Sequence, residues 1–117
     1  MNDISKLMAH LSYEALDEKK ADDIRVIDIS DISVIADYFI IASANNSSQM
    51  EALVDAVDER LYKAGYTCSH KEGNSTSSWI LLDYQDIIVH IFSKEDRLFY
   101  NLERIWTDGK EVSIDEL

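Results

Sequence analysis

The spacing of apolar residues predicts two amphipathic helices. In the first, six apolar residues recur at steps of three and four and so share one helical face: Ile4, Leu7, Met8, Leu11, Ala15 and Leu16. The second follows the polar capping cluster at 45–48 and stops at Gly65. Its apolar positions are Met50, Leu53, Val54, Val57, Leu61 and Tyr62. Each helix therefore has one face to bury against the rest of the fold.

Shorter runs between and after these helices have the residue content of β-strands. They cover residues 25–29, 37–43, 67–71, 78–83 and 87–92. The run at 37–43 is apolar enough to be an interior strand covered on both faces. The last two runs are separated only by Tyr84-Gln85-Asp86, which predicts an antiparallel hairpin.

A third helix is predicted from about residue 94 to 106, where apolar residues again recur at helical spacing. The resulting order, α-β-β-α-β-β-β-α, indicates an α/β (α+β) fold, with one mixed sheet of about five strands and helices packed on it. The 117 residues include no proline and no glycine-rich linker, which predicts a single domain over residues 1–117. We expect its core at about 3–107 and a short acidic tail at 111–117.

The composition is that of an ordinary folded protein: 46% of the residues are hydrophobic and 29% are charged. No apolar run approaches the ~20 residues that a membrane-spanning helix needs. The first residues lack the basic-then-apolar order of a secretory signal. The single cysteine, Cys68, has no partner for an internal disulfide. We therefore expect a cytoplasmic protein that neither enters nor binds a membrane.

The chain is strongly acidic. It has 23 acidic and 11 basic residues, a formal net charge of −12. Affinity for nucleic-acid backbones comes largely from Lys and Arg, so direct binding to RNA or DNA is not expected. Basic proteins are the partners that such a charge attracts. Solubility alone also accounts for many acidic surfaces, so the charge by itself does not decide between these two interpretations.

The residue types that carry catalysis or bind metals do not form a known pattern. Candidate metal ligands have none of the spacings of structural zinc sites: His10, Cys68, His70 and His90. No Gly-x-Ser-x-Gly elbow is present, and the three glycines form no phosphate-binding loop. His90 alternates with apolar residues within a predicted strand, as a semi-buried, hydrogen-bonded histidine does. We expect no metal and no cofactor.

Aromatic and arginine residues gather in the last third of the chain. Trp79, Leu81 and Asp83 share one face of their predicted strand, and Ile80, Leu82 and Tyr84 share the other. In the third predicted helix, one helical face carries Arg97, Tyr100 and Arg104. Trp, Tyr and Arg dominate binding hot spots, but large aromatic residues are also common in cores. Composition alone leaves both interpretations open.

These residues belong to a series of segments in a fixed order along the chain. The segments are Asp37-Tyr38-Phe39-Ile40-Ile41, Glu72-Gly73, Trp79-Ile80-Leu81-Leu82-Asp83-Tyr84, residues 86–92 with His90, and Arg97-x-x-Tyr100-x-Leu102-Glu103-x-x-Trp106. Together they resemble the ribosomal silencing factor family (RsfS, also called Iojap-like). The resemblance covers nearly the whole chain, from the first predicted helix to Trp106. It is carried by the order and spacing of the segments, because no single segment is diagnostic.

This resemblance implies a non-enzymatic factor that binds the fourteenth large-subunit ribosomal protein, at the face where the small subunit docks. Such a factor would block joining of the two subunits and lower translation when nutrients are scarce. The family's fold is similar to nucleotidyltransferase domains, but this chain lacks the Gly-Ser and Asp-x-Asp pattern with which those enzymes hold a magnesium nucleotide. Isolated members of the family look like homodimers, so the resemblance also implies that this chain can form a homodimer.

The contacts to the ribosomal partner are expected in the hairpin strand and the third helix. The residues that we expect to make them are Trp79, Leu81, Asp83, Tyr84, Arg97, Tyr100 and Arg104. The alternative hypothesis is a nucleotidyltransferase-like, magnesium-dependent enzyme that uses acidic residues such as Asp83 and Asp86. A third possibility is a scaffold that works only as a homodimer.

Overall fold

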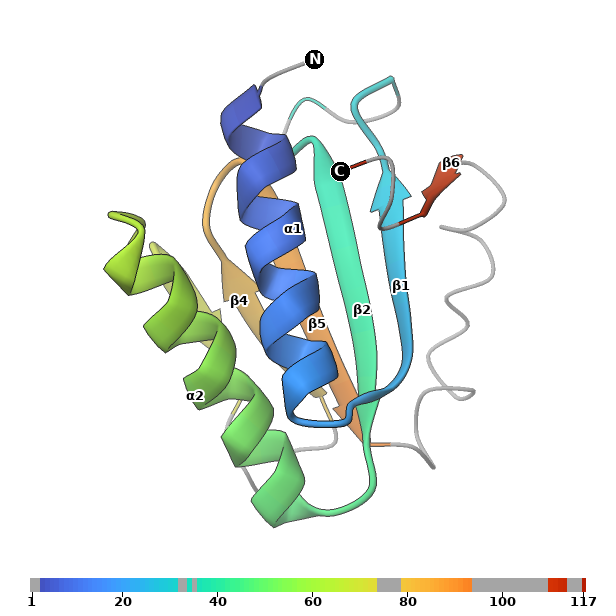
Figure 1. The fold of residues 1–117 in the computed structure, drawn as a ribbon, viewed down its shortest axis with the longest axis vertical. Helices are drawn as coiled ribbons and strands as arrows, with labels where there is room; N and C mark the ends of the chain where they lie inside the picture. The colour runs from blue at the N-terminus through green and yellow to red at the C-terminus, as the bar shows by residue number, and fades with distance from the viewer. Residues whose placement is uncertain (1–2, 32–33, 35, 74–78, 94–109, 114–116) are drawn as a thin grey trace.

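The described residues of the protein form two helices and one mixed sheet. The computed structural model describes residues 3–31, 34, 36–73, 79–93, 110–113 and 117. Along these residues the elements are α1 (Asp3–Glu18), β1 (Asp22–Asp28), β2 (Tyr38–Ala44), α2 (Ser47–Lys63), β3 (His70–Glu72), β4 (Trp79–Asp83), β5 (Ile87–Ser93) and β6 (Lys110–Val112). The predicted α/β class and mixed sheet are confirmed (Figure 1).

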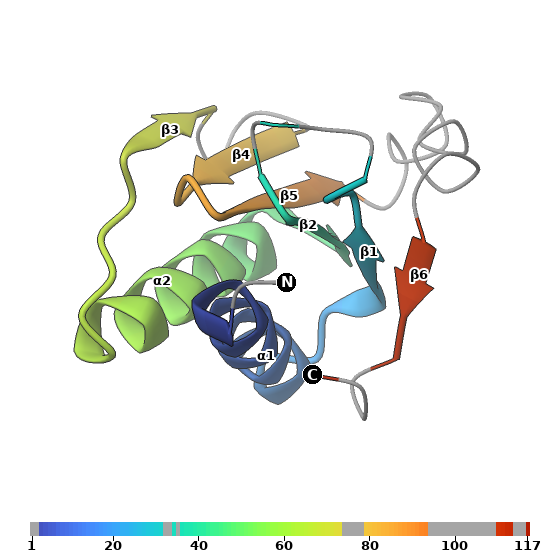
Figure 2. The ribbon, with the colours of Figure 1, turned by 90° about the horizontal axis from the view of Figure 1, so that it is seen from above.

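The described strands make a six-stranded sheet in the order β3-β4-β5-β2-β1-β6. The central pair, β2 and β5, is parallel, whereas every other neighbouring pair is antiparallel. Helices α1 and α2 both lie on the same face of this sheet (Figure 2). The chain thus has a helix-covered face and an opposite face, and successive residues of each strand alternate between the two.

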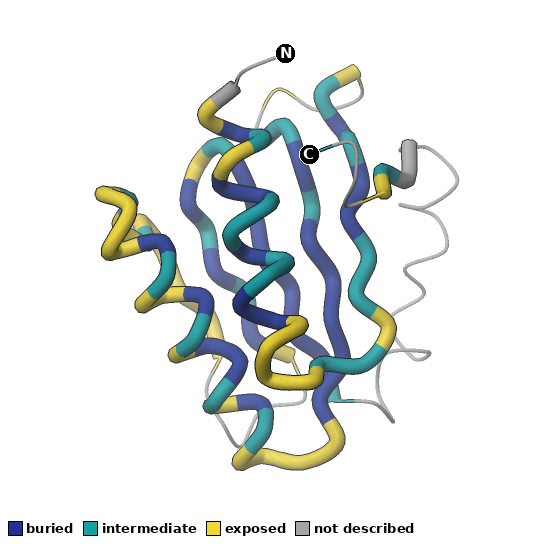
Figure 3. Tube along the Cα trace, viewed as in Figure 1, coloured by how far each residue is buried: buried dark blue, intermediate teal, exposed yellow. Residues whose placement is uncertain are grey.

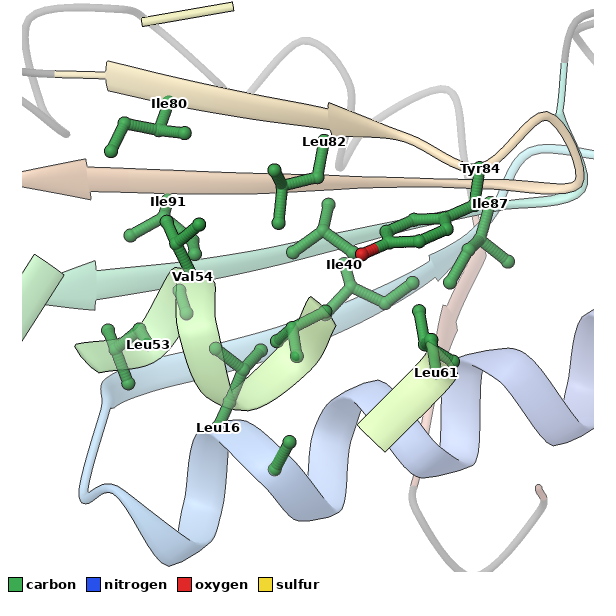
Figure 4. Packing of buried hydrophobic residues seen from close by; sticks show 14 of the residues in the cluster. Leu16, Ile40, Leu53, Val54, Leu61, Ile80, Leu82, Tyr84, Ile87 and Ile91 are labelled. Carbon is green, nitrogen blue, oxygen red and sulfur yellow. The ribbon is translucent and has the colours of Figure 1, made fainter. Parts of the chain in front are cut away.

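The main core fills the space between the helices and the sheet. Leu16 of α1 and Leu53 of α2 pack there with Ile40, Ile91 and other strand residues (Figure 4). Both strands of the central pair run through this core, and their residues in register, such as Ile40 and Val89, are fully buried. Burying an aliphatic side chain of this size contributes ~2 kcal/mol, so this layer is a main source of stability.

The opposite face of the sheet also carries buried apolar residues. They are Ile27, Ile29, Ala36, Ile41, Ile88 and Phe92. The tube in Figure 3 is accordingly dark along most of the central strands. This two-sided burial explains why 37–43 and 87–92 are nearly continuous apolar runs. For 37–43 it confirms the prediction of an interior strand covered on both faces.

Helix α2 has a cap at each end that matches its sequence. The side chain of Asn46 accepts a hydrogen bond from the backbone N–H of Gln49, which satisfies a free donor of the first turn. At the other end the N–H of Tyr66 donates to the carbonyl of Leu61, across a Gly65 with φ of +96°. This is the Schellman arrangement, in which glycine takes the left-handed conformation at little cost.

The structure corrects two sequence predictions at the ends of the sheet. Strand β6 pairs with β1 in antiparallel register, with Val26 opposite Val112, so the segment predicted as an acidic tail contributes to the sheet. The weak strand predicted at 67–71 is the three-residue edge strand β3, whose residues are all exposed. The predicted third helix at 94–106 lies outside the described residues.

Candidate functional site

The candidate site is the side of β4 that faces away from the helices. We call Trp79, Leu81 and Asp83 the β4 face, because alternation along the strand places these three together. Their intervening neighbours, Ile80 and Leu82, are buried beneath the helices. The sequence prediction that these two groups occupy opposite faces is therefore confirmed.

Trp79 is the most exposed member of the β4 face and has defined contacts on its inner side. The residue is 37% exposed. The indole stacks on Phe92, its partner in the β4–β5 register, with ring centroids 5.5 Å apart and planes 8° from parallel. Its Nε1–H donates a hydrogen bond of 3.1 Å to Nδ1 of His90. Trp79 thus combines an exposed surface with a fixed orientation, as anchor residues of interfaces do.

His90 is a buried neutral histidine. It is 6% exposed, and burial lowers its pKa from 6.5 to about 4. The ring of Phe39 contacts it edge-on, with centroids 4.8 Å apart. Its Nδ1 accepts the Trp79 hydrogen bond, so the proton of the neutral ring resides on Nε2. Among the residues that the structure describes, that buried Nε2 has no hydrogen-bond partner. Sequence analysis anticipated a hydrogen-bonded, semi-buried histidine here but not its partner.

Asp83 has a structural role as well as a place on the β4 face. Its carboxylate accepts a hydrogen bond of 2.7 Å from the backbone N–H of Gln85, and its carbonyl accepts one from Ser69. Gln85 has φ of +74°, which the tight β4–β5 turn requires. The carboxylate therefore stabilises the hairpin that presents Trp79.

Tyr84 does not lie on the candidate surface. It is 4% exposed and points toward α2, where its hydroxyl donates to Oδ1 of Asp58 at 2.9 Å. Burial and the Asp58 carboxylate together raise its pKa. The expectation that Tyr84 contacts a partner is corrected for a simple reason: alternation along β4 continues through residue 84 and directs its side chain into the core, among the residues of Figure 4.

The other expected contacts, Arg97, Tyr100 and Arg104, lie outside the described residues. Among the described residues, no group of three or more His, Cys, Asp or Glu side chains is arranged to hold a metal ion. The Sγ of Cys68 contacts the backbone carbonyls of His70 and Asp83, and burial raises its pKa. That thiol is therefore held in its protonated, less reactive form.

Sequence comparison assigns the chain to a known group of proteins. The family model described as "Ribosomal silencing factor during starvation" matches residues 2–117. A ribosomal silencing factor of Bacillus subtilis is 34% identical over 110 residues, which cover 94% of this chain and 93% of that protein. One from Zymomonas mobilis is 40% identical over 106 residues, covering 91% and 80%. The chloroplastic protein Iojap of Zea mays is 32% identical over 104 residues, covering 86% and 44%.

Solved structures show the same fold. A crystal structure of a Chromobacterium violaceum protein matches with a TM-score of 0.84 and 29% identity, covering 97% of this chain and 92% of that one. A Bacillus halodurans protein matches with a TM-score of 0.77 and 31% identity, covering 88% and 93%. In the described part of this chain, neither helix has the length and apolarity needed to cross a membrane. Sequence and structure together show that this chain belongs to the ribosomal silencing factor family.

Proposed function

We propose that this protein binds the fourteenth large-subunit ribosomal protein and thereby sterically blocks joining of the small subunit. It would act in the cytoplasm and lower translation under nutrient limitation. Family membership supports a ribosomal target, and the relatives are named as silencing factors rather than as enzymes. Inhibition by occupying a surface requires no catalytic group.

The observation that carries this proposal is the exposure of Trp79 on β4, a strand that pairs with β3 on one side and β5 on the other. Trp79 is 37% exposed and so leaves apolar surface for a partner to cover, while the stacking of its indole on Phe92 limits the entropy lost on binding. Leu81 extends the same surface, and Asp83 places a carboxylate at its end. Arg97, Tyr100 and Arg104 stay predictions for the same interface.

The charge of the chain supports a basic partner. Its net charge is −12, and described arginines are already engaged with acidic neighbours: Arg60 contacts Glu14 and Glu18, and Arg25 contacts Asp23. Ribosomal proteins are basic as a class, so long-range attraction would steer this factor toward them. That contribution weakens as salt concentration rises.

The test is affinity for purified large ribosomal subunits, measured by co-sedimentation, and for the isolated fourteenth large-subunit protein, measured by calorimetry. We expect Trp79→Ala to weaken both by about thirtyfold, which corresponds to the ~2 kcal/mol of a typical hot spot. The matched control is Tyr62→Ala, because Tyr62 is 68% exposed but lies on α2, across the sheet from the β4 face. Equal affinities for wild type and Trp79→Ala would contradict the proposal.

A further inference from the structure

We propose that His90 is a positioning residue for Trp79: its imidazole accepts the indole N–H and holds Trp79 in the orientation that contacts the partner. This inference rests on the proposed function, because it assigns Trp79 to the ribosomal interface. The inference goes beyond the proposed function because it names a buried residue, away from the contact surface, on which the affinity for the ribosomal partner depends.

The geometry fixes the indole in two independent ways. In the β4–β5 register Trp79 lies opposite Phe92 and diagonal to His90, which itself lies opposite Leu81. Stacking on Phe92 sets the plane of the indole but leaves free which edge points inward. The hydrogen bond from Nε1 to Nδ1 of His90, 3.1 Å long, selects that edge. With both contacts in place, the indole is held in one orientation rather than in the flipped one.

The hydrogen bond requires a neutral imidazole. A doubly protonated ring would direct its own N–H at the indole N–H, and the two donors would repel. The residues in register beside His90 are Leu81 on β4 and Ile41 on β2, and Phe39 packs on its ring; none of these ionises. The low-polarity surroundings therefore favour the acceptor form.

Charged groups lie farther along the same face and have partners of their own. Asp83 is two residues from Leu81 on β4 and accepts the N–H of Gln85. On β1, Arg25 lies opposite Ile41 and is paired with Asp23. On β3, His70 and Glu72 lie opposite Asp83 and Leu81 and contact each other. Each of the three carboxylates, Asp83, Asp23 and Glu72, thus has a partner other than His90. Within the described part of the chain, Nε2 of His90 is buried without a hydrogen-bond partner.

The direct test is nuclear magnetic resonance of the wild-type protein labelled with ¹⁵N. The chain has two tryptophans, and Trp106→Phe assigns the remaining indole signal to Trp79. We expect a scalar coupling across the hydrogen bond between Trp79 Nε1 and His90 Nδ1 at neutral pH, and its loss when His90 is protonated in acid. A proton found on Nδ1 at neutral pH, or no coupling, would overturn the inference without reference to any ribosome.

The functional test compares two substitutions of nearly equal shape. Asn at position 90 retains an acceptor near the place of Nδ1, whereas Leu fills similar space and accepts nothing. We expect His90→Leu to weaken binding to the isolated fourteenth large-subunit protein about tenfold, as loss of one orienting hydrogen bond implies, and His90→Asn to restore most of it.

These outcomes separate the inference from the proposed function. Loss of binding in Trp79→Ala with wild-type binding in His90→Leu would overturn the positioning role and leave the proposed function standing. Wild-type binding in Trp79→Ala would overturn the proposed function and, with it, the functional part of the inference. Equal weakening by Leu and Asn would also count against positioning, since only the acceptor distinguishes the two variants.

Discussion

Replacing Gly73 by alanine is expected to disturb the strand that carries Trp79. Gly73 has φ of +88°, and a Cβ built on it would lie 2.4 Å from the carbonyl oxygen of Trp79 and 3.2 Å from Cα of Ile80. The left-handed backbone costs an alanine ~1–2 kcal/mol. Forcing an added methyl group into a filled site costs a further ~1–3 kcal/mol, because backbone must move. We therefore predict a total loss of about 3 kcal/mol.

Gly65 provides a matched control. Its φ is +96°, nearly the same, but a Cβ built there has no atom within 4 Å. Gly65→Ala therefore incurs the backbone penalty alone, ~1–2 kcal/mol, and leaves the β4 face unchanged. The difference between the two variants isolates the close approach of Gly73 to β4.

The assay is urea unfolding of wild type and both variants, with the slope m checked for equality so that midpoints report stability. Binding to the isolated fourteenth large-subunit protein is measured alongside. Gly73→Ala is expected to be the less stable variant and to bind more weakly, because displacing the Trp79 carbonyl displaces its side chain. If Gly73→Ala were as stable as Gly65→Ala and bound like wild type, the reasoning from the close contact would be refuted.

Three further outcomes follow from the described contacts. Burial lowers the pKa of His90 from 6.5 to about 4, so between these pH values the unfolded chain binds more protons than the folded one. The contribution of His90 to the free energy of unfolding is therefore full above pH ~6.5 and falls by about 3 kcal/mol toward pH ~4. Urea titrations over this pH range measure it as the difference in stability between wild type and His90→Asn. Tyr84→Phe removes the hydrogen bond to Asp58 and is expected to cost ~1 kcal/mol of stability in urea unfolding with no change in ribosome affinity; a large loss of affinity would contradict its core placement. Gln85→Gly relieves a backbone φ of +74°, so we expect it to raise the free energy of unfolding by ~1 kcal/mol and, with it, the midpoint of thermal unfolding. A lower midpoint would show that the turn is unstrained.

Local patterns were sufficient to predict most elements of the fold. The three- and four-residue spacing predicted α1 and α2 because each buries one face against the sheet. Ile4, Leu7 and Tyr62, which the spacing assigned to those faces, are exposed. The continuous apolar run of β2 was predicted because both its faces are buried. Strand β6 was missed because Lys110-Glu111-Val112 has a single apolar residue, and its strand conformation comes from pairing with β1. Pairings of this kind depend on distant residues and are invisible in a local window.

The candidate site was predicted in part. Alternation along β4 correctly grouped Trp79, Leu81 and Asp83, and the same alternation excludes Tyr84, which was nevertheless chosen for its residue type. The partnership of Trp79 with His90 was missed because it depends on the register of the hairpin. The sequence does contain a signal for the contact between Trp79 and His90. A two-residue hairpin loop at Gln85-Asp86 sets a register in which Leu81 lies opposite His90 and Trp79 lies diagonal to His90.

Under the proposed function, the bound factor prevents the two ribosomal subunits from joining. The most direct measurement is light scattering of purified small and large subunits mixed under joining conditions, with the large subunits first saturated with the factor. We predict that wild-type protein suppresses the rise in scattering and that Trp79→Ala, at the same concentration, does not. Subunits that join at the normal rate while the wild-type factor stays bound to them would contradict the account.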